Sequence, residues 1–184
     1  ICDQVEDPAL AKGLVKREVT ETVTPGTVLA DNLLSERRNN FLVALVGSPD
    51  GSHGLATLDV STGELSVQRV PEGELRAELG RLEPSEVLLP RALAESAEVA
   101  FAAPLTLPRT VRDDWMFEQD IAAAELLKAY AVQSLDGFGF QSHDDALIRA
   151  GGALIQYLAE IRPAGVTHLK AVQIRRPGRV MLLD

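Results

Sequence analysis

The sequence of 184 residues predicts an α/β fold. Three segments of strand length come first, at residues 41–46, 55–60 and 65–70, and turn-forming residues separate them. Segments with helical spacing then alternate with short apolar segments as far as residue 161. Antiparallel strands followed by alternating helices and strands are typical of the ribonuclease-H-like order, which combines a mixed sheet with flanking helices.

The three strand segments differ in their patterns. Residues 41–46 (FLVALV) are continuously apolar, which predicts a central strand buried on both faces. Residues 47–54 predict a hairpin loop, and residues 61–64 predict a tight turn in which Gly63 has a positive φ. Residues 65–70 alternate between apolar and polar, so we expect a strand with one solvated face at the edge of the sheet.

Helical spacing begins after the third strand. Leu75, Leu79 and Leu82 form one apolar stripe, which ends before Pro84. Residues 86–89 predict a short strand, and residues 99–107 predict another that Pro104 interrupts. A second helix is predicted over residues 117–135. Its expected apolar face consists of Ile121, Ala124, Leu127, Ala131 and Leu135.

A third helix follows the loop at residues 137–141. Ser142 is its expected N-cap, and Asp145 places a carboxylate in the first turn, near the positive end of the helix dipole. The apolar stripe that predicts this helix consists of Leu147, Ala150, Leu154, Leu158 and Ile161.

The two ends of the sequence have different patterns from the middle. Residues 1–14 predict a helix, residues 19–23 a strand, residues 24–27 a turn and residues 29–39 a linker. Residues 169–184 are basic and typical of a strand. Neither end closes a structural unit, so we expect a central domain between two partial domains.

Composition excludes several classes of protein. The formal net charge is −9, and most of the excess negative charge lies in residues 39–135, which disfavours direct binding of a phosphate backbone there. No apolar run reaches the length of a membrane span, and the first residues do not resemble a signal peptide. A single cysteine, Cys2, fits a reducing, cytoplasmic location.

No segment has the residues of a nucleotide or metal site. The loop at residues 47–54 (GSPDGSHG) lacks the lysine that a phosphate-binding loop requires. The Gly-Phe-Gly-Phe segment at residues 137–140 follows a helix rather than a strand, which is the wrong context for a nucleotide loop. The three histidines, His53, His143 and His168, lack the spacing of metal ligands.

A metal-dependent nuclease is the alternative that a ribonuclease-H-like fold suggests. Two-metal chemistry requires several carboxylates that converge on the ions. The first strand offers no acid, Asp59 is the only strand carboxylate, and Glu64 lies in the turn that follows. Asp113, Asp114, Glu118 and Asp120 are instead expected to favour the start of a helix.

The segments ICDQVEDPALAKGLVKREVTETVTPGTV, RRNNFLVAL, GLATLDVSTGEL, RLEPSEVLLP, GFGF and AGGALIQYLAEI, in this order, resemble the bacterial MutS family of DNA mismatch-recognition proteins. The resemblance covers the whole chain. It implies that residues 1–38 end the mismatch-binding domain and its linker. Residues 39–135 are the expected connector domain, and residues 136–184 the expected start of the helical core or lever domain.

The resemblance also sets expectations for activity. The family reads a mismatch through a Phe-x-Glu motif and hydrolyses ATP with Mg²⁺ through a phosphate-binding loop, and neither motif occurs here. We therefore expect no catalytic, cofactor or metal site in this chain. ATP, Mg²⁺ and mismatched duplex DNA are expected to bind other domains of a homodimeric parent protein.

A contact with the MutL partner protein is the function that the resemblance implies for the connector. Gln133, Ser134 and Asp136 are the expected contact residues, because they end the predicted second helix and adjoin the Gly-Phe-Gly-Phe loop. The alternative is that these residues only end the helix before an interdomain loop. The strand at residues 65–70 is the next candidate surface.

Overall fold

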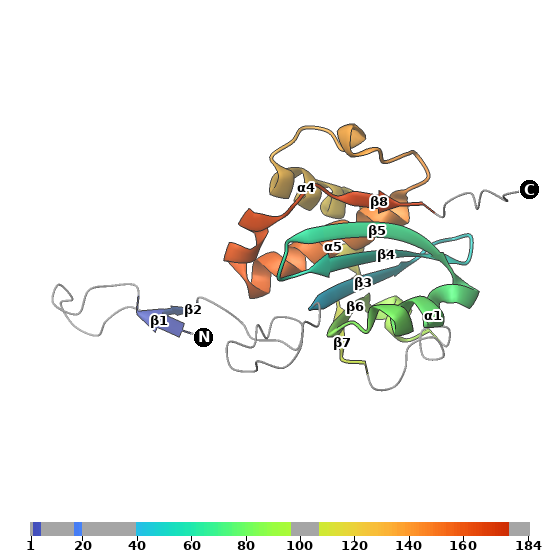
Figure 1. The fold of residues 1–184 in the computed structure, drawn as a ribbon, viewed down its shortest axis with the longest axis horizontal. Coiled ribbons are helices and arrows are strands. Elements are labelled where there is room, and N and C mark those ends of the chain that lie inside the picture. Colours follow the sequence, from blue (N-terminus) through green and yellow to red (C-terminus); the bar gives the residue numbers. More distant parts are fainter. Residues whose placement is uncertain (1, 5–16, 20–39, 97–106, 177–184) are drawn as a thin grey trace, which may run out of the picture.

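The computed structural model describes residues 2–4, 17–19, 40–96 and 107–176 (Figure 1). Two sheets lie in these residues. A two-stranded sheet pairs β1 (Cys2–Gln4) antiparallel with β2 (Arg17–Val19). A six-stranded sheet has the order β7-β6-β3-β4-β5-β8.

The six-stranded sheet is mixed, as predicted. Its first three strands, β3 (Phe41–Gly47), β4 (Ser52–Asp59) and β5 (Glu64–Pro71), pair antiparallel through two tight turns. Three parallel strands extend this meander. β6 (Glu86–Pro90) pairs with β3, β7 (Arg109–Arg112) pairs with β6, and β8 (Gln173–Arg175) pairs with β5. The α/β class and the ribonuclease-H-like arrangement are therefore confirmed.

The turns of the meander follow the sequence. Gly63 has a φ of 71°, as predicted, and Gly51 has a φ of 78° in the turn between β3 and β4. The predicted loop at residues 47–54 is shorter than expected, because β4 already begins at Ser52. β3 lies between β6 and β4, and its residues 42–46 are buried, which confirms the predicted central strand.

Helices cover both faces of the sheet (Figure 1). On one face, Leu75, Leu79 and Leu82 of α1 (Glu72–Leu82) pack against alternate residues of the strands. On the other face lies α5 (Asp145–Ile161), and α4 (Gln119–Tyr130) packs against it. All five residues of the stripe predicted for α5 are buried. Most of the rest of α5 is also buried, because the helix contacts both the sheet and α4.

Glycines allow backbone contact on both sides of α5. A Cβ atom at Gly54 of β4 would lie 2.2 Å from the carbonyl oxygen of Ala146. A Cβ atom at Gly152 would lie 2.1 Å from the carbonyl oxygen of Ala122 in α4. Neither site can hold a larger residue without a backbone shift, so these contacts fix the spacing of the layers.

The prediction that residues 65–70 form an edge strand is wrong. Their burial does alternate, but β8 pairs in parallel with Ser66, Val67 and Gln68. Alternation reports only that one face of a strand meets solvent, and it does not report whether another backbone covers the edge. The covering strand comes from residues about 100 positions later, which no local pattern indicates.

Helix boundaries required further corrections. The second helix, expected at residues 117–135, ends at Tyr130, where Ala131 adopts a left-handed conformation with φ 51°. Its buried residues are Ala122 and Leu126, whereas Ala124 and Ala131 of the expected face are exposed. The N-cap of α5 is Asp144 rather than Ser142.

The N-terminal prediction is partly wrong. Residues 2–4 are a strand rather than part of a helix, because they pair with β2. Val19 of the strand predicted at residues 19–23 lies in β2, and residues 20–23 lie outside the described residues. The predicted turn at 24–27, the linker at 29–39 and the strand at 99–107 lie outside the described residues, except for Leu107.

Four short helical segments complete the described elements: α2 (Arg91–Ala94), η1 (Asp114–Phe117), η2 (Asp136–Phe138) and η3 (Pro163–His168). The predicted boundary between residues 135 and 136 falls inside one hydrophobic core. Strands β3, β4 and β5 contribute to this core together with α4 and α5, and Ile174 of β8 packs against it. The polypeptide on both sides of the predicted boundary therefore belongs to the same packed body.

Candidate functional site

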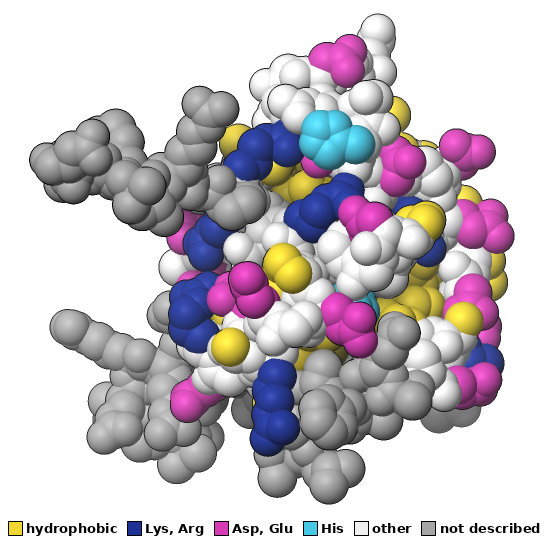
Figure 2. Space-filling view, turned by 90° about the vertical axis from the view of Figure 1, so that its right-hand side faces the viewer, with side chains coloured by type: hydrophobic (Ala, Val, Ile, Leu, Met, Phe, Trp, Pro, Cys, Tyr) yellow, Lys and Arg dark blue, Asp and Glu magenta, His cyan; other side chains and the backbone are white. Residues whose placement is uncertain are grey.

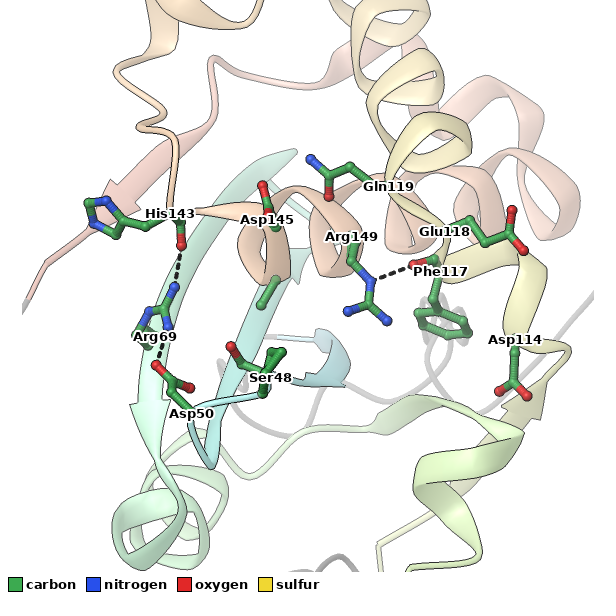
Figure 3. Close-up of a pocket in the computed structure, with 12 residues that line it drawn as sticks. Ser48, Asp50, Arg69, Asp114, Phe117, Glu118, Gln119, His143, Asp145 and Arg149 are labelled. Carbon is green, nitrogen blue, oxygen red and sulfur yellow. Dashed lines mark hydrogen bonds and ion pairs between the residues drawn. The ribbon is translucent and has the colours of Figure 1, made fainter.

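Two adjoining clefts lie at the end of the sheet where α5 begins. The first has a volume of about 640 Å³, and the β3–β4 turn, β5, η1 and the first turns of α4 and α5 surround it (Figure 3). The second has a volume of about 680 Å³ and shares Asp50, Arg69 and His143 with the first. The two clefts therefore form one surface at which the meander, the loop before α5 and β8 meet.

Arg69 joins the meander to the loop before α5. Its Nη1 atom lies 2.7 Å from Oδ2 of Asp50, and its Nη2 atom donates a hydrogen bond to the carbonyl oxygen of His143 (Figure 3). Hydrogen bonds from the side chain and the backbone of Ser52 hold the pKa of Asp50 well below its usual range, and the charge of Arg69 lowers it further. The ion pair is largely exposed, so its free-energy contribution is small.

Arg149 of α5 lies at the back of the first cleft. Its Nε atom donates to the carbonyl oxygen of Phe117 at 2.7 Å, and its Nη1 atom lies 3.5 Å from the carbonyl oxygen of Gly47 (Figure 3). Within the described part of the chain, Arg149 forms no ion pair with a carboxylate. Its role in this structure is to join α5 to η1 and to the end of β3.

Asp144 is the most buried charged group at the second cleft, with 1% of its side chain exposed. Both nitrogen atoms of the Arg176 fork contact it, Nη2 to Oδ2 at 2.7 Å and Nη1 to Oδ1 at 3.3 Å. The backbone amide of Gln141 also donates to Oδ2 at 2.9 Å. Burial alone would raise the pKa of Asp144, but the hydrogen bonds from Arg176 and Gln141 outweigh it, and the pKa is lowered overall.

The surface around the second cleft is mixed in charge. Figure 2 shows basic side chains and a histidine around a hollow with an apolar floor, with acidic side chains beside them. Pro71 and Leu147 supply apolar lining, whereas Arg69 and Arg176 are both paired with carboxylates. This arrangement positions backbone segments. The Ser52 hydroxyl donates to Oδ1 of Asp50 at 2.6 Å, and this carboxylate is also paired with Arg69.

The carboxylates of the central strands divide between the two faces of the sheet. Glu64, which was expected in the turn after Asp59, begins β5 and pairs in register with Asp59, so these two carboxylates share a face. Asp59 pairs in register with Phe41, on the face that α1 covers, and accepts hydrogen bonds from Ser61. Glu86 pairs with Leu42, on the face that α5 covers, and accepts hydrogen bonds from Tyr157 and Thr110 at 2.5 Å each. Because Glu86 lies on the face opposite to Asp59 and Glu64, it cannot join them at one metal ion.

Sequence reasoning missed Glu86. Asp59 was expected to be the only strand carboxylate, but Glu64 begins β5, and Glu86 begins β6 and is 1% exposed. The available signal was an acidic residue at the start of a segment that is otherwise apolar. Across the described residues, no group of three or more His, Cys, Asp or Glu side chains is arranged to hold a metal ion.

The acidic residues before α4 lie at helix starts, as expected. Asp113 is the N-cap residue of η1, Asp114 lies in the first turn of η1, and Glu118 is the N-cap residue of α4. Oδ1 of Asp114 accepts a hydrogen bond from the backbone amide of Ala92 at 3.0 Å, and Asp113 pairs with Arg91 at 3.1 Å. These two carboxylates therefore bind the first turn of α2, Asp114 through a backbone amide and Asp113 through a side chain. Only Asp120 lies in the first turn of α4.

The expected partner-contact residues lie in the loop between α4 and α5. Gln133, Ser134 and Asp136 are exposed, and none of them lines either cleft. The Ser134 hydroxyl donates to Oδ2 of Asp136 at 2.6 Å and accepts from the backbone amide of Asp136 at 3.1 Å. The argument from free carbonyl groups at a helix end is wrong, because α4 ends at Tyr130.

No described helix has the length and apolar character that crossing a membrane requires.

Comparison with known families identifies two matches along the chain. The model described as MutS domain II matches residues 40–170, and the model described as MutS domain I matches residues 1–32. The first match runs from β3 to the end of η3, so it includes α5 but not β8.

Three proteins that are similar in sequence to this chain share one name. DNA mismatch repair protein MutS of Chlorobaculum tepidum is 40% identical over 191 residues, covering 100% of this chain and 21% of that protein. The protein of the same name from Symbiobacterium thermophilum is 41% identical over 191 residues, with the same coverage. The one from Thermosynechococcus vestitus is 47% identical over 172 residues, covering 87% of this chain and 19% of that protein. The chain therefore spans about a fifth of the length of these relatives.

Proposed function

This chain belongs to the MutS family of DNA mismatch repair proteins, and from that premise we propose that it is the connector region of a longer protein, which relays conformational change between the mismatch-binding domain and the lever and ATPase domains. The observation that supports the relay is the continuous packing from β3 to β8. Cores on both faces of the sheet tie the described residues of 41–96 and 107–175 into one body. A body packed in this way moves as a unit and transmits displacement from one end to the other.

The proposal assigns mismatch reading and ATP hydrolysis to other parts of the parent protein. Neither a Phe-x-Glu motif nor a phosphate-binding loop occurs in the sequence. We therefore propose that the chain itself is not an enzyme, and that ATP and Mg²⁺ bind elsewhere in a cytoplasmic, homodimeric parent. The nuclease alternative is weaker, because Glu86 lies on the face opposite to Asp59 and Glu64, and no group of three or more possible ligands is arranged around a metal site in the described residues.

The relay can be tested by breaking the path of transmission. In the full-length protein, six Gly and Ser residues inserted after Arg176 would form a flexible segment that transmits no displacement. The same insertion at Gly51, in the exposed β3–β4 turn, is the matched control. We expect the first insertion to reduce the stimulation of ATP turnover by mismatched DNA, while DNA affinity and basal turnover stay unchanged. Equal stimulation in both variants contradicts the relay.

A contact with a MutL-type partner is the second part of the proposal. Gln133, Ser134 and Asp136 remain the proposed contact, supported by their exposure in the α4–α5 loop. The strand at residues 65–70 is a weaker second choice, because β8 covers its edge.

The contact can be tested by charge reversal in the full-length protein. Asp136→Lys combined with Gln133→Ala should reduce capture of the MutL-type protein. Glu74→Lys, an exposed charge reversal on α1, should leave capture unchanged. Unchanged capture in the double variant, with mismatch binding intact, would rule out this surface.

A further inference from the structure

The last described residue, Arg176, holds three parts of the fold together. It directly follows β8, and its side chain reaches back to the loop between α4 and α5. One guanidinium contacts both oxygens of Asp144, and its Nη2 atom also donates to the carbonyl oxygen of Gly139 at 3.2 Å. A planar fork with several donors can make these contacts at once, whereas a lysine cannot.

Both the side chain and the backbone of Asp144 form hydrogen bonds with neighbouring segments. Its carboxylate accepts from the Gln141 amide, and its carbonyl oxygen accepts from the backbone amides of Leu147 and Ile148 at 2.9 and 3.0 Å. The residue is therefore at once the end of the loop and the N-cap of α5. A shift of Arg176 would act directly on the first turn of the helix that covers the sheet.

The segment that leads to Arg176 is itself held along its length. The Lys170 amide donates to the carbonyl oxygen of Gly63 at 2.8 Å, and the Tyr130 hydroxyl donates to the carbonyl oxygen of Lys170 at 2.9 Å. Val172 is buried, and β8 then pairs with β5. Arg176 thus adds a further anchor to a segment that crosses the edge of the sheet.

The neighbouring residues provide a natural comparison. Arg175 carries the same charge one residue earlier, but no described carboxylate lies within ion-pair distance of it. Asp145 carries the same charge as Asp144 one residue later, and it is exposed. The contact therefore depends on position, and general attraction between a basic segment and an acidic loop does not explain it.

We propose that Arg176 and Asp144 form a joint that fixes the direction in which the chain leaves the sheet and couples that direction to the α4–α5 loop and α5. The inference rests on the proposed relay and deepens it by naming the residues through which displacement enters the body. Arg176 is a positioning residue in this scheme. In this scheme, a displacement of the chain after β8 is transmitted to α5 through the bidentate ion pair between Arg176 and Asp144.

The joint can be tested by hydrogen–deuterium exchange in the full-length protein. We expect Arg176→Gln to accelerate exchange by about tenfold or more at residues 137–144 as well as at residues 173–176, because hydrogen bonds to a charged group are lost. Asp144→Asn should accelerate exchange in the same two segments, and the double variant should add little. Arg175→Gln and Asp145→Asn should leave both segments unchanged.

Two outcomes overturn the proposal. If Arg176→Gln accelerates exchange only at residues 173–176, the two segments are not coupled and the joint is wrong. If both segments respond but stimulation of ATP turnover by mismatched DNA stays unchanged, the ion pair is only structural. Arg176→Lys keeps the positive charge but loses the planar guanidinium. We therefore expect intermediate effects on amide exchange and on the stimulation of ATP turnover by mismatched DNA. Wild-type values for this variant would contradict the role of the bidentate contact. The insertion after Arg176 tests the relay separately, so the two failures can be distinguished.

Discussion

Gly152 of α5 lies against the backbone of Ala122 in α4, so closely that a Cβ atom at position 152 would be 2.1 Å from the carbonyl oxygen of Ala122. The nearest atoms all belong to the backbone, which cannot move aside as a flexible side chain can. The pair therefore sets the distance between the two helices, and through α5 the distance of α4 from the sheet.

Gly152→Ala should lower the free energy of unfolding. Alanine favours a helix by about 1 kcal/mol relative to glycine, but overpacking costs about 1–3 kcal/mol, and here the contact is with backbone. We expect a net loss, measured by urea denaturation. Gly80→Ala in α1 has no atom within 4 Å of the new Cβ and should be neutral or stabilising. A loss of equal size in both variants would contradict the contact.

Gly63→Ala should be more destabilising than Gly51→Ala. Both glycines have a positive φ, so both substitutions carry a strain of about 1–2 kcal/mol. Only at Gly63 would the new Cβ meet another segment, at 2.2 Å from the carbonyl oxygen of His168. Urea denaturation should rank the two variants. Exchange at residues 168–175 should rise only in Gly63→Ala, and equal exchange would exclude this contact.

Tyr157→Phe should cost about 1–3 kcal/mol of stability, because it removes a buried donor to Glu86. Tyr130→Phe is the matched control. Its hydroxyl donates to the carbonyl oxygen of Lys170 in an exposed hydrogen bond, and water can replace it there. We expect a smaller loss for the control by thermal and urea denaturation. Equal losses of stability in the two variants would mean that the buried hydrogen bond from Tyr157 to Glu86 stabilises the fold no more than the exposed one.

Stability should depend on pH through Asp144. Its pKa in the folded state is below the usual value of 3.8, so the unfolded state binds more protons at acidic pH. The stabilisation is complete above the usual pKa and is lost as pH falls through the folded pKa. Asp144→Asn should therefore cost about 1.5–3 kcal/mol near neutral pH, and the difference should shrink in acid. Urea denaturation across this range tests the expectation, with Asp145→Asn as the control. A difference that is independent of pH would contradict it.

The isolated chain should not prefer mismatched over matched duplex DNA. Its net charge is −9, and Arg69 and Arg176 at the clefts are already paired with carboxylates. The Arg69 and Arg176 side chains are therefore less able to replace the counterions of a phosphate backbone. Fluorescence anisotropy at about 150 mM salt provides the measurement. Submicromolar binding with discrimination between the two duplexes would overturn the assignment of mismatch reading to other domains.

The meander, α1 and the apolar stripe of α5 were predictable from local patterns. The continuous apolar run of β3 indicates burial on both faces, and leucines at helical spacing indicate one buried face of α1. The end of α4 was not predictable, because its pattern continues past Tyr130 while the backbone turns at Ala131. Packing against α5 selected Ala122 and Leu126 as the buried residues, in place of the face that the spacing favoured.

The candidate site was less predictable than the fold. Glycine at position 63 indicated a turn with positive φ, since other residues are strained there. The basic character of residues 169–184 was also visible. The pairing of Arg176 with Asp144 was not, because a charged side chain in sequence does not indicate which distant carboxylate it will meet.

By itself, the sequence determined the α/β class, the order of the meander and helices, and the resemblance to the MutS family, because these depend on local spacing and on motifs that are read directly. Only the tertiary structure decided that β8 covers the edge of β5, that Asp59 and Glu86 lie on opposite faces, and that Arg176 closes on Asp144. Each of these relationships joins residues that are far apart in the chain. Such pairings depend on the path of the backbone through the packed layers, and periodicity carries no information about that path.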